Sequence, residues 1–196
     1  MKETIKAIIE KIETLSLDRC IVAIDGRCAS GKTTLAEELG SMLDCSVIHM
    51  DDFFLQPNQR TEMRLNEAGG NIDYERFLYE VINPIQRNAN FSYRPFDCHS
   101  LGFKEAKEIF VTNKEIFVTN AVIIEGAYAC HPKFADIYDL KVFLDVDKKE
   151  QLKRIEKRNG KNQLLAFENK WIPMEEKYFK EFSIKEMCDA VYKVNF

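Results

Sequence analysis

Three features are missing from this chain of 196 residues, and each absence argues against a class of protein. No apolar run approaches the roughly 20 residues that a helix needs to cross a bilayer, so we expect no membrane-spanning segment. Positive charge is not in excess, because the formal net charge is -4, which argues against binding nucleic acid by neutralising its phosphates. The six cysteines are scattered without a C-x-x-C pair, which indicates reduced thiols rather than disulfides or a zinc site.

The N-terminal segment lacks the features of a secretion signal. Acidic residues are spread through MKETIKAIIEKIETLSLDRC and interrupt its apolar positions. Ile5, Ile8, Ile12 and Leu15 recur at helical spacing, so residues 1–17 are predicted to form an amphipathic helix that packs on the domain. We therefore expect a cytoplasmic protein whose partners include neither a membrane nor nucleic acid.

What the chain does contain is an alternation of short apolar runs and helical patterns. The predicted strands are CIVAID, SVIHM, AVIIEGAY, LKVFLDVD and VYKV. Near-continuous apolar runs of this length are typical of parallel strands that are covered on both faces. The sequence therefore predicts one α/β domain over residues 1–196, with a central, mainly parallel five-stranded sheet flanked by helices.

The stretch GRCASGKT follows the first apolar run and precedes a helical pattern. It matches the phosphate-binding P-loop, G-x-x-x-x-G-K-[ST], at every fixed position. Its backbone N–H groups would surround phosphate oxygens, and the next helix would add partial positive charge. Lys32 would reach the β- and γ-phosphates of ATP, and the Thr33 hydroxyl would coordinate Mg²⁺. The predicted nucleotide-binding residues are Gly26, Arg27, Cys28, Ala29, Ser30, Gly31, Lys32, Thr33 and Thr34.

A small-molecule kinase is the P-loop class that fits this chain best. The sequence lacks the N-K-x-D motif by which GTPases recognise guanine, since neither NKEI nor NKWI ends in aspartate. A kinase needs a base near the acceptor hydroxyl, a metal, and cations that hold the migrating phosphoryl group.

Carboxylates follow two of the predicted strands. Asp51 and Asp52 follow SVIHM, and Glu125 ends the apolar run AVIIE. Ligands of open parallel sheets bind beyond the carboxyl ends of the strands, so Asp51 and Glu125 should share an edge with the P-loop. One carboxylate could take the acceptor's proton and the other could hold the metal through water. Phe53 and Phe54 could wall the acceptor pocket and exclude water.

The chain resembles uridine kinase-like proteins, within the uridine kinase and phosphoribulokinase group of P-loop kinases. The segments that carry the resemblance are GRCASGKTT, MDDFFL, GNIDYERF, VIIEGAY and LKRIEKRNG, in the order of that family. The resemblance implies a three-layer P-loop NTPase fold, with residues 53–120 as an acceptor-binding insert and residues 148–170 as a small helical lid. It also implies that Asp51 is the general base and helps to hold Mg²⁺, and that Glu125 has a metal-associated role.

The same resemblance implies further site residues. Asp73 would bind the ribose hydroxyls of a nucleoside, and Arg154 and Arg158 would contact the phosphates from the lid helix. The stretch YRPFDCHS is similar to the Y-D-F-x-x-H-S segment that contacts the pyrimidine, but it is one residue longer and adds an arginine. The predicted acceptor-binding residues are Asp73, Tyr93, Phe53, Arg94 and His99, with Phe96 as a further candidate in that segment.

The acceptor is the main alternative that the sequence leaves open. The resemblance implies the 5′-hydroxyl of uridine or cytidine, and Arg94 is compatible with a phosphorylated sugar, a sugar acid or a pantothenate-like compound. An ATP-sensing regulator without catalysis is the rival from another class. A homo-oligomer and GTP as the donor also stay open. The heptapeptide KEIFVTN occurs twice, at 107–113 and 114–120, as a hairpin pair or a tolerated surface duplication.

Overall fold

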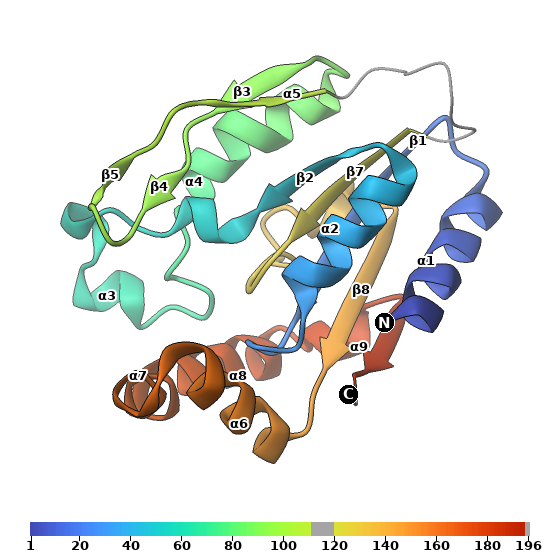
Figure 1. Cartoon of the computed structure of the whole chain (residues 1–196). Coiled ribbons are helices and arrows are strands. Elements are labelled where there is room, and N and C mark those ends of the chain that lie inside the picture. The colour runs from blue at the N-terminus through green and yellow to red at the C-terminus, as the bar shows by residue number, and fades with distance from the viewer. Residues whose placement is uncertain (111–119, 195–196) are drawn as a thin grey trace.

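The computed structural model describes residues 1–110 and 120–194 (Figure 1). At its centre is a five-stranded sheet in the order β2-β7-β1-β8-β9, and every pairing in it is parallel. The strands are β1 (Arg19–Gly26), β2 (Ser46–His49), β7 (Asn120–Glu125), β8 (Leu140–Asp145) and β9 (Ala190–Lys193). The predicted α/β class and its five-stranded sheet are therefore confirmed.

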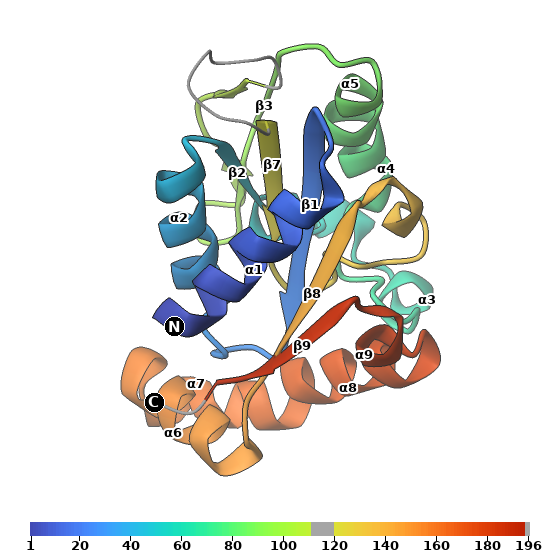
Figure 2. The same ribbon diagram turned by 90° about the vertical axis from the view of Figure 1, so that its right-hand side faces the viewer.

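Helices cover both faces of the sheet and complete three layers (Figure 2). One face packs against α1 (Lys2–Leu15) and α2 (Lys32–Leu43), and the other packs against α4 (Tyr74–Phe77), α5 (Asn83–Gln86), α8 (Ile172–Glu181) and α9 (Ile184–Met187). In β1, Val22 and Ile24 join the core beside α1, whereas Ile21 and Ala23 join the opposite core. A strand buried on both faces needs apolar residues at successive positions, which explains the continuous run.

The segment after β2 forms short elements around the carboxyl edge of the sheet. A 3-10 turn (Met50–Phe53), a second 3-10 turn (Pro57–Gln59) and α3 (Glu62–Leu65) lead to α4. A π-helical turn (Leu78–Ile82) joins α4 to α5, and the helix continues through Pro84. Two antiparallel ribbons follow, β3 (Phe91–Tyr93) with β6 (Lys107–Ile109) and β4 (Phe96–Asp97) with β5 (Gly102–Phe103).

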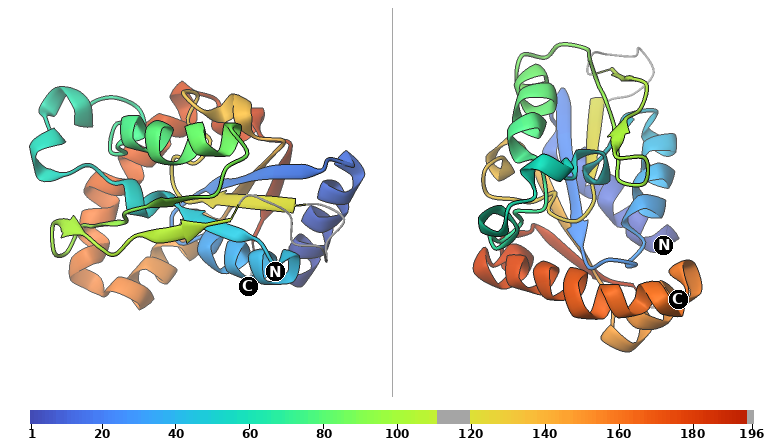
Figure 3. Two further views of the ribbon diagram at one scale, coloured as in Figure 1. Left: turned by 90° about the horizontal axis from the view of Figure 1, so that it is seen from above. Right: turned by 90° about the vertical axis from the view of Figure 1, so that its left-hand side faces the viewer.

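Helices after β8 cross the carboxyl end of the sheet (Figure 3). A 3-10 turn (Ala135–Ile137) precedes β8, and α6 (Lys148–Asn159) follows it. The Asp147 side chain accepts a hydrogen bond from the Lys149 N–H and caps α6. Then α7 (Lys161–Ala166), a π-turn (Phe167–Trp171) and α8 form one helical run. Within the described residues, no helix combines the length and apolar character that a membrane crossing needs. Most of the KEIFVTN repeat, residues 111–119, lies outside the described residues.

Candidate active site

The P-loop joins β1 to α2 at the carboxyl edge of the sheet. Gly26 has φ +134°, and a Cβ on it would lie 2.2 Å from the Leu144 carbonyl oxygen, so only glycine fits there. The Lys32 ammonium donates hydrogen bonds of 2.9 Å to the carbonyl oxygens of Gly26 and Arg27. The loop therefore winds around its own lysine, and the lysine is positioned beside the loop's backbone N–H groups.

A buried carboxylate anchors the start of the loop. The Asp25 side chain is fully buried and accepts hydrogen bonds from the Gly26 N–H at 2.6 Å, the Cys130 N–H at 2.9 Å and the Tyr178 hydroxyl at 2.8 Å. Burial raises the pKa of Asp25, and these hydrogen bonds act in the opposite direction. Asp25 thus ties the P-loop to the segment after β7 and to α8. Sequence reasoning missed this role.

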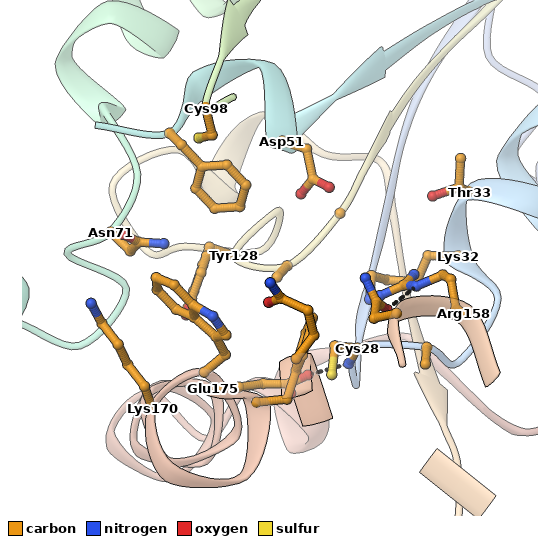
Figure 4. Close-up of a pocket in the computed structure, with 18 of the residues that line it drawn as sticks. Cys28, Lys32, Thr33, Asp51, Asn71, Cys98, Tyr128, Arg158, Lys170 and Glu175 are labelled. Atoms are coloured by element: carbon orange, nitrogen blue, oxygen red, sulfur yellow. Dashed lines mark hydrogen bonds between the residues drawn. The ribbon is translucent and has the colours of Figure 1, made fainter. Parts of the chain in front are cut away.

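A cavity of about 700 Å³ opens beside the P-loop. Figure 4 shows the Asp51 carboxylate and the Thr33 hydroxyl directed into it from different elements. The predicted site residues that line it are Cys28, Ala29, Gly31, Lys32, Thr33, Thr34, Asp51, His99, Glu125, Arg154 and Arg158. Those that lie outside its lining are Gly26, Arg27, Ser30, Phe53, Asp73, Tyr93 and Arg94. The structure therefore brings the predicted phosphate-side residues together and separates most of the predicted acceptor-side residues from them.

Glu125 lies at the end of β7, next to the first turn of α2. The Thr33 hydroxyl donates to Glu125 Oε1 at 3.2 Å, and Nδ1 of His49 lies 2.6 Å from the same oxygen. Glu125 Oε2 is buried and has no hydrogen-bond partner among the described residues. A free carboxylate oxygen beside a hydroxyl is a donor set that suits Mg²⁺, so these residues fit that ion.

The protein would supply only part of a magnesium coordination shell. Across residues 1–110 and 120–194, no group of three or more histidine, cysteine, aspartate or glutamate side chains is placed to hold a metal. Mg²⁺ normally keeps several waters and binds one or two carboxylates together with substrate phosphates. Thr33, Asp51 and Glu125 could therefore hold the ion jointly with a nucleotide.

The two adjacent aspartates have different surroundings. Asp51 lies in the 3-10 turn after β2 and faces the cavity. Burial, and secondly the charge of Glu125, raise the pKa of Asp51. Asp52 instead accepts hydrogen bonds of 2.8 Å from the Tyr93 hydroxyl and the Lys107 ammonium. Asp51 is thus available to a ligand, while Asp52 holds the β3–β6 ribbon to the body of the domain.

Four of the predicted acceptor-binding residues make contacts within the protein and do not line the cavity. The buried Asp73 carboxylate caps α4 by accepting the Arg76 N–H, and it also accepts the Gln59 side-chain N–H at 2.8 Å. Phe53 is buried, with its ring centroid 5.0 Å from that of Tyr93. The Arg94 guanidinium lies 4.6 Å from the centroid of the Phe103 ring.

The two arginines predicted to belong to a lid, Arg154 and Arg158, line the cavity, and Arg158 lies beside Lys32 (Figure 4). The Arg154 guanidinium donates to the Ala29 carbonyl oxygen at 3.3 Å and pairs with Glu150 at 3.0 Å. Arg158 is exposed and donates to the Asn159 side-chain oxygen at 2.8 Å. Both belong to α6, one turn apart, so they lie on the same side of that helix.

Several lining residues were not predicted from the sequence. They are Arg60, Leu65, Asn71, Cys98, Gly126, Ala127, Tyr128, Asn159, Gln163, Phe167, Lys170, Trp171 and Glu175. Phe54, which was predicted as a wall of the acceptor pocket, also lines the cavity. Six of the residues without a predicted role lie in segments that carry the family resemblance, namely Asn71, Cys98, Gly126, Ala127, Tyr128 and Asn159. Arg60 donates to the Leu55 carbonyl oxygen at 3.0 Å, and no described carboxylate lies within ion-pair distance of Arg60 or Lys170. Figure 4 shows Lys170 on the side of the cavity away from Lys32.

No protein-family model matches the chain. A structure described as a possible uridine kinase from Bacillus stearothermophilus superposes with a TM-score of 0.65 at 18% sequence identity, covering 95% of this chain and 99% of that one. YFH7 from Saccharomyces cerevisiae, described as a P-loop containing kinase with a circular permutation, superposes with a TM-score of 0.57 at 11% identity and covers 100% and 99%. These similarities show that the chain has the three-layer fold of P-loop kinases.

Proposed function

We propose that this protein is an ATP-dependent kinase that transfers the γ-phosphoryl group to a hydroxyl of a small molecule. One observation carries the proposal: Lys32 and Thr33 of the P-loop line the same cavity as the Asp51 carboxylate. A nucleotide phosphate beside Lys32 and an acceptor oxygen beside Asp51 would then lie in the same cavity. Positioning and electrostatic stabilisation supply most of the catalysis in phosphoryl transfer, and this arrangement offers both.

Each side chain then has a definite role. Asp51 accepts the proton of the acceptor hydroxyl as its oxygen attacks phosphorus. Thr33, Asp51 and Glu125 would hold Mg²⁺, which would neutralise charge on the phosphate oxygens. Arg154 and Arg158 contact the transferring phosphoryl group from the lid, because guanidinium matches the geometry of phosphate oxygens.

The sequence resemblance supports uridine or cytidine as the acceptor, phosphorylated on the 5′-hydroxyl. A second class of acceptor has its own support, because Arg60 and Lys170 line the cavity without a described carboxylate partner. Two such cations favour an acceptor that carries a phosphate or carboxylate, such as a phosphorylated sugar, a sugar acid or a pantothenate-like compound. A non-catalytic ATP sensor would have no use for Asp51 in that cavity.

A panel of acceptors tests these proposals. The protein is incubated with ATP, Mg²⁺ and either a nucleoside, a sugar phosphate, a sugar acid or pantothenate, and phosphorylated products are detected by mass spectrometry. Product from uridine or cytidine supports the nucleoside acceptor, and product from an anionic compound alone supports the second class. Intact ATP binding without product across the whole panel contradicts a kinase and supports a sensor.

A further inference from the structure

A carboxyl group from α8 lies against the P-loop. Oε1 of Glu175 accepts a hydrogen bond from the backbone N–H of Cys28, the third residue of the loop (Figure 4). Oε2 of Glu175 is buried and has no hydrogen-bond partner among the described residues. Glu175 lines the cavity, yet only 3% of its surface is exposed. The phosphate-binding loop thus already holds an acidic side chain at one of its amide groups.

The protonation state of Glu175 decides whether this contact hinders or helps the binding of a phosphate. The charged carboxylate repels a triphosphate and competes with it for the Cys28 N–H. The neutral acid can keep Oε1 as the acceptor of that N–H, while the hydroxyl on Oε2 gains a proton to donate. A neutral Glu175 therefore adds a hydrogen-bond donor to the loop, whereas a charged one adds an unpaired buried acceptor.

The groups around Glu175 come from several elements. Lys32 begins α2, Arg27 and Cys28 belong to the P-loop, Asp25 is the last residue but one of β1, and Tyr128 follows β7. Burial raises the pKa of Glu175 to about 7; Lys32, the Cys28 N–H and Arg27 lower it, and Asp25 raises it further.

The two nearby cations are already engaged. Arg27 pairs with Asp145 at 2.9 Å and with Glu176, while the Lys32 ammonium donates to two loop carbonyl oxygens. Neither cation forms an ion pair with Glu175 in the described structure. The negative charge of Glu175 is therefore only partly compensated. A bound triphosphate would repel that charge and so shift Glu175 towards the neutral form.

We propose that Glu175 is a proton-binding site of the phosphate cradle, which takes up one proton from solvent when ATP binds and then holds the nucleotide as a neutral carboxyl. The inference rests on the proposed function, because it assigns the P-loop to a nucleotide. Binding joins ATP, one solvent proton and the glutamate carboxylate, and no covalent bond other than O–H forms. ATP affinity must then fall as the pH rises through about 7. The neutral fraction falls about tenfold between pH 6 and pH 8, so Kd rises about tenfold.

Titration calorimetry with Mg²⁺ and ATP at pH 6, 7 and 8 tests this proposal. Each titration is repeated in two buffers of different ionisation enthalpy, which yields the number of protons taken up. Wild type is compared with Glu175→Gln, whose amide keeps one acceptor and one donor without titrating. The matched control is Glu181→Gln, which removes an exposed charge from the same helix.

We expect wild type and Glu181→Gln to bind ATP about tenfold more weakly at pH 8 than at pH 6, with uptake of nearly one proton at pH 8. Glu175→Gln should lose that uptake and keep at pH 8 an affinity close to that of wild type at pH 6. The nucleotide's own phosphates titrate near pH 6 and can also take up protons. The proton count of Glu175→Gln measures that uptake, so it is subtracted from the wild-type count.

The inference and the proposed function fail in different ways. If wild type binds ATP without proton uptake, or shares its pH dependence with Glu175→Gln, Glu175 is not the proton site and the kinase proposal stands. If wild type binds no ATP at any pH, the proposed function and this inference both fall. Thermal unfolding of each variant verifies folding. If Glu175→Gln does not fold, proton uptake by wild type at pH 8 decides the matter, because the nucleotide's phosphates are almost fully ionised at that pH.

Discussion

Nδ1 of His49 lies 2.6 Å from Oε1 of Glu125, the same oxygen that accepts the Thr33 hydroxyl. Nε2 of His49 lies 3.3 Å from Glu37, so the imidazole bridges two carboxylates. The hydrogen bond with Glu125 raises the pKa of His49 and favours its charged form. His49 therefore fixes the orientation of a residue that we propose as a magnesium ligand.

We expect His49→Ala to lower magnesium-dependent turnover by about 10- to 100-fold, the usual effect of losing a side chain that orients a metal ligand. The measurement is turnover as a function of Mg²⁺ concentration at saturating ATP. Glu37→Gln is the matched control, since it leaves the contact between His49 and Glu125 in place. A His49→Ala enzyme with the wild-type magnesium dependence would contradict an orienting role.

Asp51 and Asp52 provide a matched pair of neighbouring carboxylates. Asp51→Asn should lower turnover by about a hundredfold or more while ATP affinity stays within a few fold, as for the loss of a positioned base. Asp52→Asn should keep most of the activity, because Asp52 bonds to Tyr93 and Lys107 rather than lining the cavity. Steady-state kinetics and ATP titrations separate the two effects, and equal losses in both variants would remove Asp51 as the base. Lys32→Ala should differ from both by losing ATP binding.

Arg158 and Lys157 are adjacent cations on α6, and only Arg158 lines the cavity. We expect Arg158→Ala to lower kcat by about tenfold or more, because a guanidinium near the transferring phosphoryl group stabilises its charge in the transition state. Lys157→Ala removes the same charge from the exposed face and should leave kcat nearly unchanged. Equal kcat values for the two variants would make the basic helix a solvated surface rather than a lid.

Local patterns were enough to predict the sheet and half of the candidate site. The five strands follow from apolar runs, and the P-loop follows from its fixed spacing between a strand and a helix. Asp51 shares the P-loop edge because parallel strands end together. The contact between Glu175 and Cys28 joins residues 147 positions apart, and no short pattern encodes it. Asp73 shows a second reason why sequence reasoning is incomplete. The resemblance assigns Asp73 to ribose binding, but aspartate is also a preferred N-cap residue of helices. In the structure Asp73 caps α4.

His131 is a buried histidine outside the cavity lining, and it makes the stability of the fold sensitive to acid. Only 4% of its surface is exposed, and its ring lies among those of Tyr74, Phe134, Tyr178 and Phe182. Nδ1 of His131 accepts the Lys133 N–H at 3.2 Å, which requires the neutral ring. Burial lowers the pKa of His131 from 6.5 to about 4.

The unfolded chain therefore binds a proton at His131 more readily than the folded one does. The contribution of His131 is fully present above about pH 6.5 and is lost as the pH falls towards 4, by about 3 kcal/mol at 1.36 kcal/mol per pH unit. Urea unfolding of wild type and His131→Phe at pH 7 and pH 4.5 measures the contribution of His131 to the free energy of unfolding. The variant is a suitable reference because it keeps an aromatic ring that cannot titrate. We expect wild type to lose more free energy of unfolding than the variant over that interval. Identical losses in the two proteins would show that His131 is protonated as easily in the fold as in the unfolded chain.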